Sequence, residues 1–316
     1  IDFWKRDILP SRWGKVLREA GENLYGLKEW QSQWAVFEQF IKDRLLDGKE
    51  QILSLDDLAK EQCDVYILGS DQIWARELTH GFDPVYFGQF APMSKKISYA
   101  ASVPNGSIPE AEQEYFKNAL ASLAHISVRE EKLALAVEKL TGKKVTTVVD
   151  PTLLLEKADY EDLLYKDRIV KEKYIFAYYV VENEMLSKCA QRAAKEYGYR
   201  LIELHYKKTP KIKGENMIFD AGPSEFLTYI RDAELVLTNS FHGTVFSVLF
   251  QKLFYSVYKE NGRITNLLTF LNLERRHIET DAKMDFKDKI DYTTVAEKLC
   301  SYREKSVEYL EKGIEQ

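Results

Sequence analysis

The sequence predicts an α/β protein built from two Rossmann-like halves. Short apolar runs alternate with helical patterns of about ten to fourteen residues, which is typical of βαβ units with a largely parallel sheet. The alternation starts again near Tyr174, after a charged helical stretch. With 316 residues, of which 45% are hydrophobic, the chain can bury the cores of two such domains.

In the first half, apolar runs at residues 65–68 and 95–102 predict two buried strands. The segment HISVRE predicts a short strand that ends at Arg129, and VTTVVDP predicts one that ends at Asp150. Upstream, apolar residues recur at helical spacing over residues 30–46, so we expect a helix there whose apolar face packs inward.

The second half begins with a predicted strand at residues 174–181 and continues through RLIELHY, MIFDA and LFYSVY. Its stretch AELVLTNSFHGTVFSVLF predicts a strand, a tight polar turn and a buried helix. An amphipathic pattern at residues 293–312 predicts a last helix that folds back across both domains. We expect domains at residues 1–155 and 156–290, followed by a C-terminal helix at residues 291–316.

The composition argues against several classes of function. The net charge of -5 gives no electrostatic signature of nucleic-acid binding. The three cysteines lie far apart, and the sequence contains no GxGxxG, Walker or HExxH motif. No apolar run reaches the roughly 18 residues of a membrane span. We therefore expect a cytoplasmic protein without a membrane span, metal or cofactor, whose partners are small molecules rather than nucleic acid.

The polar turn of the second half is the strongest candidate for a binding site. It contains Asn239, Ser240, Phe241, His242 and Gly243 at the carboxyl end of a predicted strand. In open α/β sheets ligands bind at this edge, where the start of the next helix attracts anions. The turn therefore suits a phosphate or a carboxylate. In the alternative interpretation, Asn239 and Ser240 cap the helix and His242 only satisfies a hydrogen bond.

The first half offers a second polar cluster after its first strand. Ser70, Asp71, Gln72 and Trp74 follow the run VYILG. We interpret them as a sugar-binding edge, because an aromatic ring can stack on the apolar side of a pyranose. The alternative is that Asp71 only caps the next helix.

Arg129 is the third candidate, because its planar fork of donors suits a carboxylate or a phosphate. The alternative is an ion pair with Glu130 or Glu131 at a solvated helix start. We interpret Asp150, which precedes Pro151, as a turn former rather than a catalytic residue.

Taken in order, the blocks DVYILGSDQIW, ISYAAS, SVREE, VVDPTLLL and PSEFLTYIRDAELVLTNSFHGTVFSVLF resemble the polysaccharide pyruvyl transferase family. The resemblance implies a GT-B-like fold, with two Rossmann-like domains facing a cleft. It implies an acceptor side in the first domain and a donor side in the second. Because members usually begin with a further strand and an Asn-Tyr-Gly turn, we expect the first domain of this chain to lack that strand.

The resemblance also implies phosphoenolpyruvate as co-substrate and a glycan or lipid-linked sugar of a cell-surface polysaccharide as acceptor. The family's donor-binding arginine and histidine fall on Arg129 and His242. Several members carry an arginine two positions before the histidine, where this chain has Ser240. We assign His242 to the donor phosphate and to proton donation, Arg129 to the donor's anionic groups, and Asp71 to the acceptor hydroxyl.

Two alternatives to a pyruvyl transferase stay open at this point. A glycosyltransferase of the same architecture could hold the diphosphate of a nucleotide sugar in the same cleft, and the missing arginine makes this more plausible. A non-catalytic glycan-binding protein could have kept the fold. The candidate residues are His242, Asp71 and Arg129 for catalysis, residues 239–243 with Arg129 for the donor, and Ser70, Asp71, Gln72 and Trp74 for the acceptor.

Overall fold

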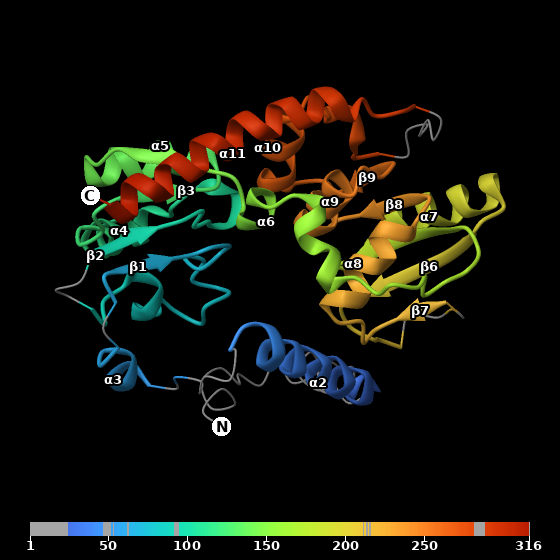
Figure 1. The fold of residues 1–316 in the computed structure, drawn as a ribbon, viewed down its shortest axis with the longest axis horizontal. Coiled ribbons are helices and arrows are strands. Elements are labelled where there is room, and N and C mark those ends of the chain that lie inside the picture. Colours follow the sequence, from blue (N-terminus) through green and yellow to red (C-terminus); the bar gives the residue numbers. More distant parts are fainter. Residues whose placement is uncertain are drawn as a thin grey trace, which may run out of the picture.

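The computed structural model describes residues 25–46, 52, 54–61, 63–91, 95–210, 212, 214, 216–280 and 288–315. Within them, parallel strands form two separate bodies that lie side by side, and helices pack around each (Figure 1). This arrangement confirms the predicted α/β class with two Rossmann-like halves.

Among its described residues, the first half contains four short parallel strands, β1 (Val65–Leu68), β2 (Lys95–Ser98), β3 (Ile126–Val128) and β4 (Val145–Thr147). β1 pairs with β2, and β3 pairs with β4. Bridges from Ile97 to His125 and from Ala101 to Val128 join the two pairs in the order β1-β2-β3-β4. Because all four strands run the same way, the loops after Leu68 and Val128 leave from one edge.

Helices α3 (Leu55–Leu58), α4 (Gln113–Leu120) and α5 (Glu131–Thr141) accompany this sheet, with 3-10 turns at Pro84–Phe87, Pro104–Gly106 and Glu110–Glu112. α5 ends at Gly142, whose φ of 71° lies in the left-handed region that glycine adopts at little cost. The core of this half includes Phe87, Phe116 and Leu120, all buried.

The second half contains a six-stranded parallel sheet in the order β10-β9-β8-β5-β6-β7. Its strands are β5 (Tyr174–Tyr179), β6 (Arg200–His205), β7 (Met217–Ile218), β8 (Leu235–Thr238), β9 (Phe254–Val257) and β10 (His277–Ile278). All four residues of β8 are buried. Leu235 and Leu237 join one hydrophobic cluster and Val236 joins another, so both faces of this central strand are covered.

Helices cover both faces of the second sheet. They are α6 (Pro151–Leu154), α7 (Glu184–Tyr197), α8 (Pro223–Asp232), α9 (Phe241–Leu249) and α10 (Gly262–Phe270), with 3-10 turns at Lys157–Leu163 and Glu274–Arg276. α9 is buried along most of its length, as its apolar sequence requires. α6 and α9 lie at the junction between the two halves (Figure 1).

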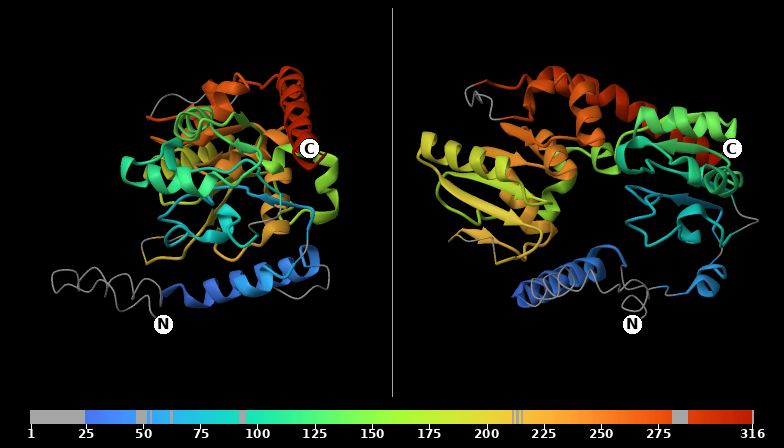
Figure 2. Two further views of the ribbon diagram at one scale, coloured as in Figure 1. Left: turned by 90° about the vertical axis from the view of Figure 1, so that its left-hand side faces the viewer. Right: turned by 180° about the vertical axis from the view of Figure 1, so that it is seen from behind.

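The last helix, α11 (Tyr292–Glu315), runs along both halves (Figures 1 and 2). Its first part contributes Val295 and Leu299 to the core of the second half. Its last part reaches the first half, where Tyr309 Oη donates to the Ser98 backbone oxygen at 2.7 Å. α11 therefore fixes the two halves relative to one another.

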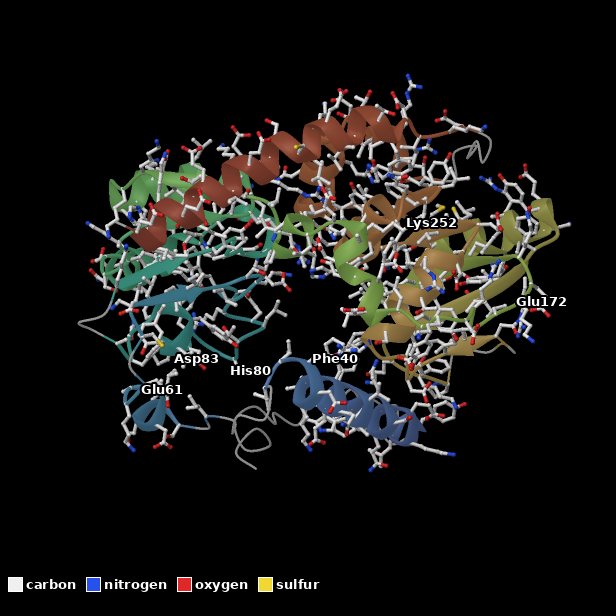
Figure 3. All side chains as sticks on the ribbon, in the orientation of Figure 1. Phe40, Glu61, His80, Asp83, Glu172 and Lys252 are labelled. Atoms are coloured by element: carbon white, nitrogen blue, oxygen red, sulfur yellow. The ribbon has the colours of Figure 1, made fainter. Side chains whose placement is uncertain are left out.

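Helix α2 (Leu27–Arg44) confirms the helix expected near the start of the chain, but the prediction that its apolar face packs inward is wrong. Trp34 is 61% exposed, and no residue of α2 is buried. The helix lies beside the start of α8: Ser32 Oγ donates to Asp220 Oδ2 at 3.0 Å, and Phe40, one member of the predicted apolar face, faces the second half (Figure 3). Most of the predicted apolar face is exposed, including Trp34, Ile41 and Leu45. Periodicity therefore identified the helix but not its partner.

In the described part of the chain, no helix combines the length and the apolar character needed to cross a bilayer.

Candidate active site

Arg129 and His242 come together on the buried carboxylate of Asp150. Arg129 follows β3, Asp150 caps α6, and His242 lies in the first turn of α9. Arg129 Nη2 is 2.7 Å from Asp150 Oδ2, and His242 Nε2 is 3.8 Å from the same oxygen. The structure thus brings together a guanidinium from one half and an imidazole from the other.

Asp150 is ionised despite its burial. Burial alone would raise the pKa of this carboxyl group, because it penalises the charged form. The contact with His242 and the charge of Arg129 outweigh burial, and the pKa of Asp150 lies below its ordinary value. Asp150 therefore places a fixed negative charge between these two side chains.

The interpretation of Asp150 as only a turn former was incomplete. Its Oδ1 does accept from the Thr152 backbone N–H at 2.9 Å and so caps α6. Its Oδ2 meanwhile faces Arg129 and His242. One carboxylate thus both starts a helix and positions the candidate site.

Arg129 is held by carboxylates on two sides. Its side chain is only 5% exposed, and Nη1 donates to Asp71 Oδ1 at 3.1 Å. Its guanidinium carbon lies 4.9 Å from the centre of the Phe241 ring. A buried guanidinium is strongly destabilising unless anions surround it, so Asp71 and Asp150 fix its position.

The alternative in which Arg129 pairs with a glutamate at a solvated helix start is wrong. Glu130 is buried, and its Oε1 accepts from Ser102 Oγ at 2.7 Å. Burial raises the pKa of Glu130, although the Ser102 hydrogen bond and the charges of Arg129 and Arg263 act in the opposite direction. The counterions of Arg129 are the aspartates of neighbouring loops.

A second arginine, Arg263, enters the cluster from the first turn of α10. Its Nη1 donates to Asp71 Oδ1 at 3.0 Å, and its guanidinium carbon lies 5.7 Å from the Phe241 ring centre. When the Gln72 amide is oriented so that both its groups find partners, its oxygen accepts from Arg263 Nη1 and Nη2 at 3.0 and 2.8 Å. Burial lowers the pKa of Arg263, and the charge of Arg129 adds to this effect.

The loop after β1 supplies the exposed part of the site. Ser70, Asp71 and Gln72 are partly exposed, and the Asp71 backbone oxygen accepts from the Ser102 N–H at 2.9 Å. The alternative that Asp71 only caps a helix is wrong, because its side chain binds two arginines and turns rather than a helix follow it. The acceptor-binding role of this loop stays a prediction.

The prediction that Trp74 stacks on a sugar is wrong. Trp74 is 1% exposed, packs in parallel on Phe87 and meets Phe116 edge to face. Its indole N–H donates to the Tyr86 backbone oxygen at 3.1 Å, which satisfies its polar group inside the core. The ring is therefore unavailable to a ligand.

The polar residues of the turn before α9 mainly build the turn itself. Ser240 Oγ accepts from the Gly243 N–H at 3.1 Å and caps α9, as the alternative interpretation expected. Asn239 Oδ1 accepts from the Val180 N–H at 2.9 Å, which joins the ends of β8 and β5. A Cβ on Gly243 would lie 2.6 Å from Thr238 Oγ1, so glycine is required there for packing against β8. Donor binding by these residues stays a prediction.

A cavity of about 530 Å³ lies between the halves under α10 and α11. Among the residues that line it are Arg129, Asp150, Phe241, Arg263, Tyr302 and Lys305. The junction between the halves is therefore hollow and charged rather than closed by apolar packing.

Sequence reasoning missed Arg263 and the second role of Asp150. Arg263 lies 21 positions after His242, outside the polar turn. One signal was available: Arg263 begins the helix after β9, at the same edge of the sheet as His242 after β8. The rule that ligands bind at this edge applies to both positions.

The fold and the site define a two-domain α/β protein with a cluster of arginine, histidine and aspartate side chains between its halves. A model of the polysaccharide pyruvyl transferase family matches residues 2–259, and the chain belongs to that family. No curated protein matches the sequence.

Several solved structures are distantly similar. A putative UDP-N-acetylglucosamine 2-epimerase from Listeria monocytogenes gives a TM-score of 0.46 at 10% identity, over 84% of this chain and 71% of that one. The UDP-GlcNAc 2-epimerase from Methanocaldococcus jannaschii gives 0.43 at 12% identity, over 80% and 72%. The accessory secretory proteins 1, 2 and 3 of Streptococcus pneumoniae give 0.44 at 11% identity, over 83% and 55%. The family assignment rests on the sequence match.

Proposed function

We propose that the protein transfers pyruvate from phosphoenolpyruvate to a sugar of a cell-surface polysaccharide and leaves it there as a ketal. The observation that carries this proposal is the convergence of Arg129 and His242 on Asp150 at the junction of the halves. Phosphoenolpyruvate brings a carboxylate and a phosphate, so its site needs cationic groups from more than one direction. Family membership supports the same reaction.

His242 is suited to contact the donor phosphate. Its side chain is 37% exposed, whereas Arg129 is almost fully buried, so a ligand can reach the imidazole directly. It also lies at the start of α9, where the helix dipole places partial positive charge. A protonated imidazole at this position can act as a general acid.

These positions support the following sequence of steps. His242 donates a proton to C3 of phosphoenolpyruvate, while the first sugar hydroxyl bonds to C2 and gives its proton to Asp71. The bond from C2 to the phosphate oxygen then breaks, and phosphate leaves with the electron pair. A second hydroxyl closes the ketal and returns a proton to His242, and the proton on Asp71 leaves with phosphate. Arg129 stabilises the negative charge that moves onto the phosphate.

The test measures release of phosphate from phosphoenolpyruvate with polysaccharide or lipid-linked sugar acceptors. His242→Ala should lower turnover at least about a hundredfold, the lower end of what a general acid contributes. His125→Ala is the matched control, because His125 lies at the other end of β3 from Arg129. Full turnover by His242→Ala would contradict the assignment.

A melting experiment separates donor classes before an acceptor is known. A ligand that binds only the native state raises the melting temperature. Phosphoenolpyruvate should raise that of the wild type, and a panel of nucleotide sugars should not. Stabilisation by a nucleotide sugar alone would favour a glycosyltransferase and contradict the proposal.

A further inference from the structure

Arg263 is a cationic group at this junction that the proposed reaction does not use. It belongs to the second half by sequence, yet its guanidinium lies against Asp71 and Gln72 of the first. Ser240, in the turn before α9, supplies no cation, because its side chain caps that helix.

We propose that Arg263 binds the carboxylate of the donor. This inference rests on the proposed function, since it takes phosphoenolpyruvate as the donor. It assigns the phosphate to His242 and the carboxylate to Arg263, with Arg129 between them.

The spacing of the two arginines fits the donor. Arg129 Nη1 and Arg263 Nη1 each lie about 3 Å from Asp71 Oδ1, so the two nitrogen atoms are at most about 6 Å apart. Both guanidinium groups also pack against the ring of Phe241. In phosphoenolpyruvate the carboxylate and the phosphate oxygen are attached to the same carbon, so neighbouring guanidinium groups can bind both.

Arg263 already holds oxygen atoms of the type that the inference requires. Its partners are a carboxylate oxygen of Asp71 and the amide oxygen of Gln72. A guanidinium fork binds planar oxygen pairs of this kind better than a single ammonium group. Burial lowers the pKa of Arg263, and the charge of Asp71 acts in the opposite direction, which shows that anions stabilise this charged guanidinium.

The competing explanation is that Arg263 only connects the two halves. In that case its loss would alter stability, but it would weaken every donor analogue to the same extent. A ligand that lacks the carboxylate separates the two explanations. Vinyl phosphate is phosphoenolpyruvate without that group.

The experiment compares the affinities of phosphoenolpyruvate and vinyl phosphate by calorimetric titration. Arg263→Ala should weaken the binding of phosphoenolpyruvate about ten- to a hundredfold, which is the range for a lost hydrogen bond to a charged group. The affinity for vinyl phosphate should stay unchanged. Arg263→Lys keeps the positive charge but not the planar pair of donors, so it should lose less affinity for phosphoenolpyruvate than Arg263→Ala does. Arg275→Ala, which removes an exposed arginine beyond the other end of α10, should bind both ligands as the wild type does. Should Arg263→Ala fail to fold, as its melting curve will show, Arg263→Lys carries the comparison.

The outcomes distinguish a failure of the Arg263 assignment from a failure of the proposed function. Equal weakening of both ligands, or no weakening of phosphoenolpyruvate, overturns the assignment of Arg263 while the proposed function stands. A wild type that binds phosphoenolpyruvate but transfers nothing contradicts the proposed function, and the binding comparison still tests Arg263. A wild type that binds no phosphoenolpyruvate overturns both.

Discussion

Arg263 Nη1 lies 3.0 Å from Asp71 Oδ1, and this contact joins residues 192 positions apart across the two halves of the molecule. Arg129 donates to the same oxygen from within the first half. The Asp71 carboxylate is therefore a point at which the two halves meet. Because the cluster is assembled from both halves, its geometry depends on how they are held together.

Asp150→Asn should lower the free energy of unfolding at pH 7 by about 3–5 kcal/mol, the usual cost of removing one partner of a buried ion pair. The substitution leaves Arg129 buried with one counterion fewer. Urea denaturation measures the change. Glu131→Gln, which removes an exposed carboxylate from the start of α5, should cost less than about 0.5 kcal/mol. Equal effects of the two substitutions would contradict the role given to Asp150.

The stabilisation by Asp150 should also disappear in acid. Its pKa in the folded protein lies below the ordinary value of 3.8. Its contribution is therefore complete above that value and is lost as the pH falls through the folded pKa. The difference in unfolding free energy between wild type and Asp150→Asn should narrow below about pH 4. A difference that does not change with pH would show that Asp150 stabilises by other means.

Glu130 should show the opposite pH dependence, because burial raises its pKa in the folded state. The folded protein then binds a proton more tightly than the unfolded chain, and stability falls as the pH rises from the unfolded to the folded pKa. Glu130→Gln keeps an acceptor for Ser102 Oγ. Its unfolding free energy should exceed that of the wild type at neutral pH and approach it near pH 4. A variant less stable than the wild type at neutral pH would contradict this.

Trp74 should contribute to the stability of the protein and not to binding of the acceptor sugar. Trp74→Ala should cost about 3–5 kcal/mol of unfolding free energy, because it empties a buried aromatic site. Trp74→Phe, which keeps much of the packing, should leave the KM for the acceptor sugar unchanged. A raised acceptor KM in a folded Trp74→Phe protein would restore the sugar-stacking interpretation.

The hydrogen bond from the Val149 N–H to Ser306 on α11 should stabilise the segment that leads to Asp150. Ser306 Oγ accepts from the Val149 N–H at 3.0 Å, one residue before Asp150. Ser306→Ala leaves that buried N–H without an acceptor and should cost about 1–3 kcal/mol. Ser301→Ala, on an exposed position of α11, is the control and should have little effect. Equal melting temperatures for the two variants would contradict a structural role for this hydrogen bond.

The sequence predicts those parts of the fold that depend on local pattern. Alternating apolar runs located the parallel strands, and the dense polar turn after β8 located His242. Periodicity does not show which surface a helix contacts. It predicts that the apolar face of α2 packs inward, whereas Trp34 on that face is exposed. Pattern alone also cannot separate a tryptophan that binds sugar from one that fills a core, as Trp74 does.

The parts of the site that escaped prediction depend on tertiary structure. Asp150 caps a helix by local sequence, and only the packing of α9 against the first half turns its second oxygen toward His242. Arg263 begins a helix in the second half and finds its partners in the first. Neither contact can be recognised from a local sequence motif, because the residues involved are far apart in the sequence.

The most direct test of the account is a crystal structure of the protein with phosphoenolpyruvate. It should place the phosphate within hydrogen-bond reach of His242 at the start of α9, with Arg129 and Arg263 around the rest of the ligand. A donor bound elsewhere, for example beside Asn183 and Asn261 in the hollow at the carboxyl ends of β5 and β9, with Arg129 and His242 out of contact, would contradict it.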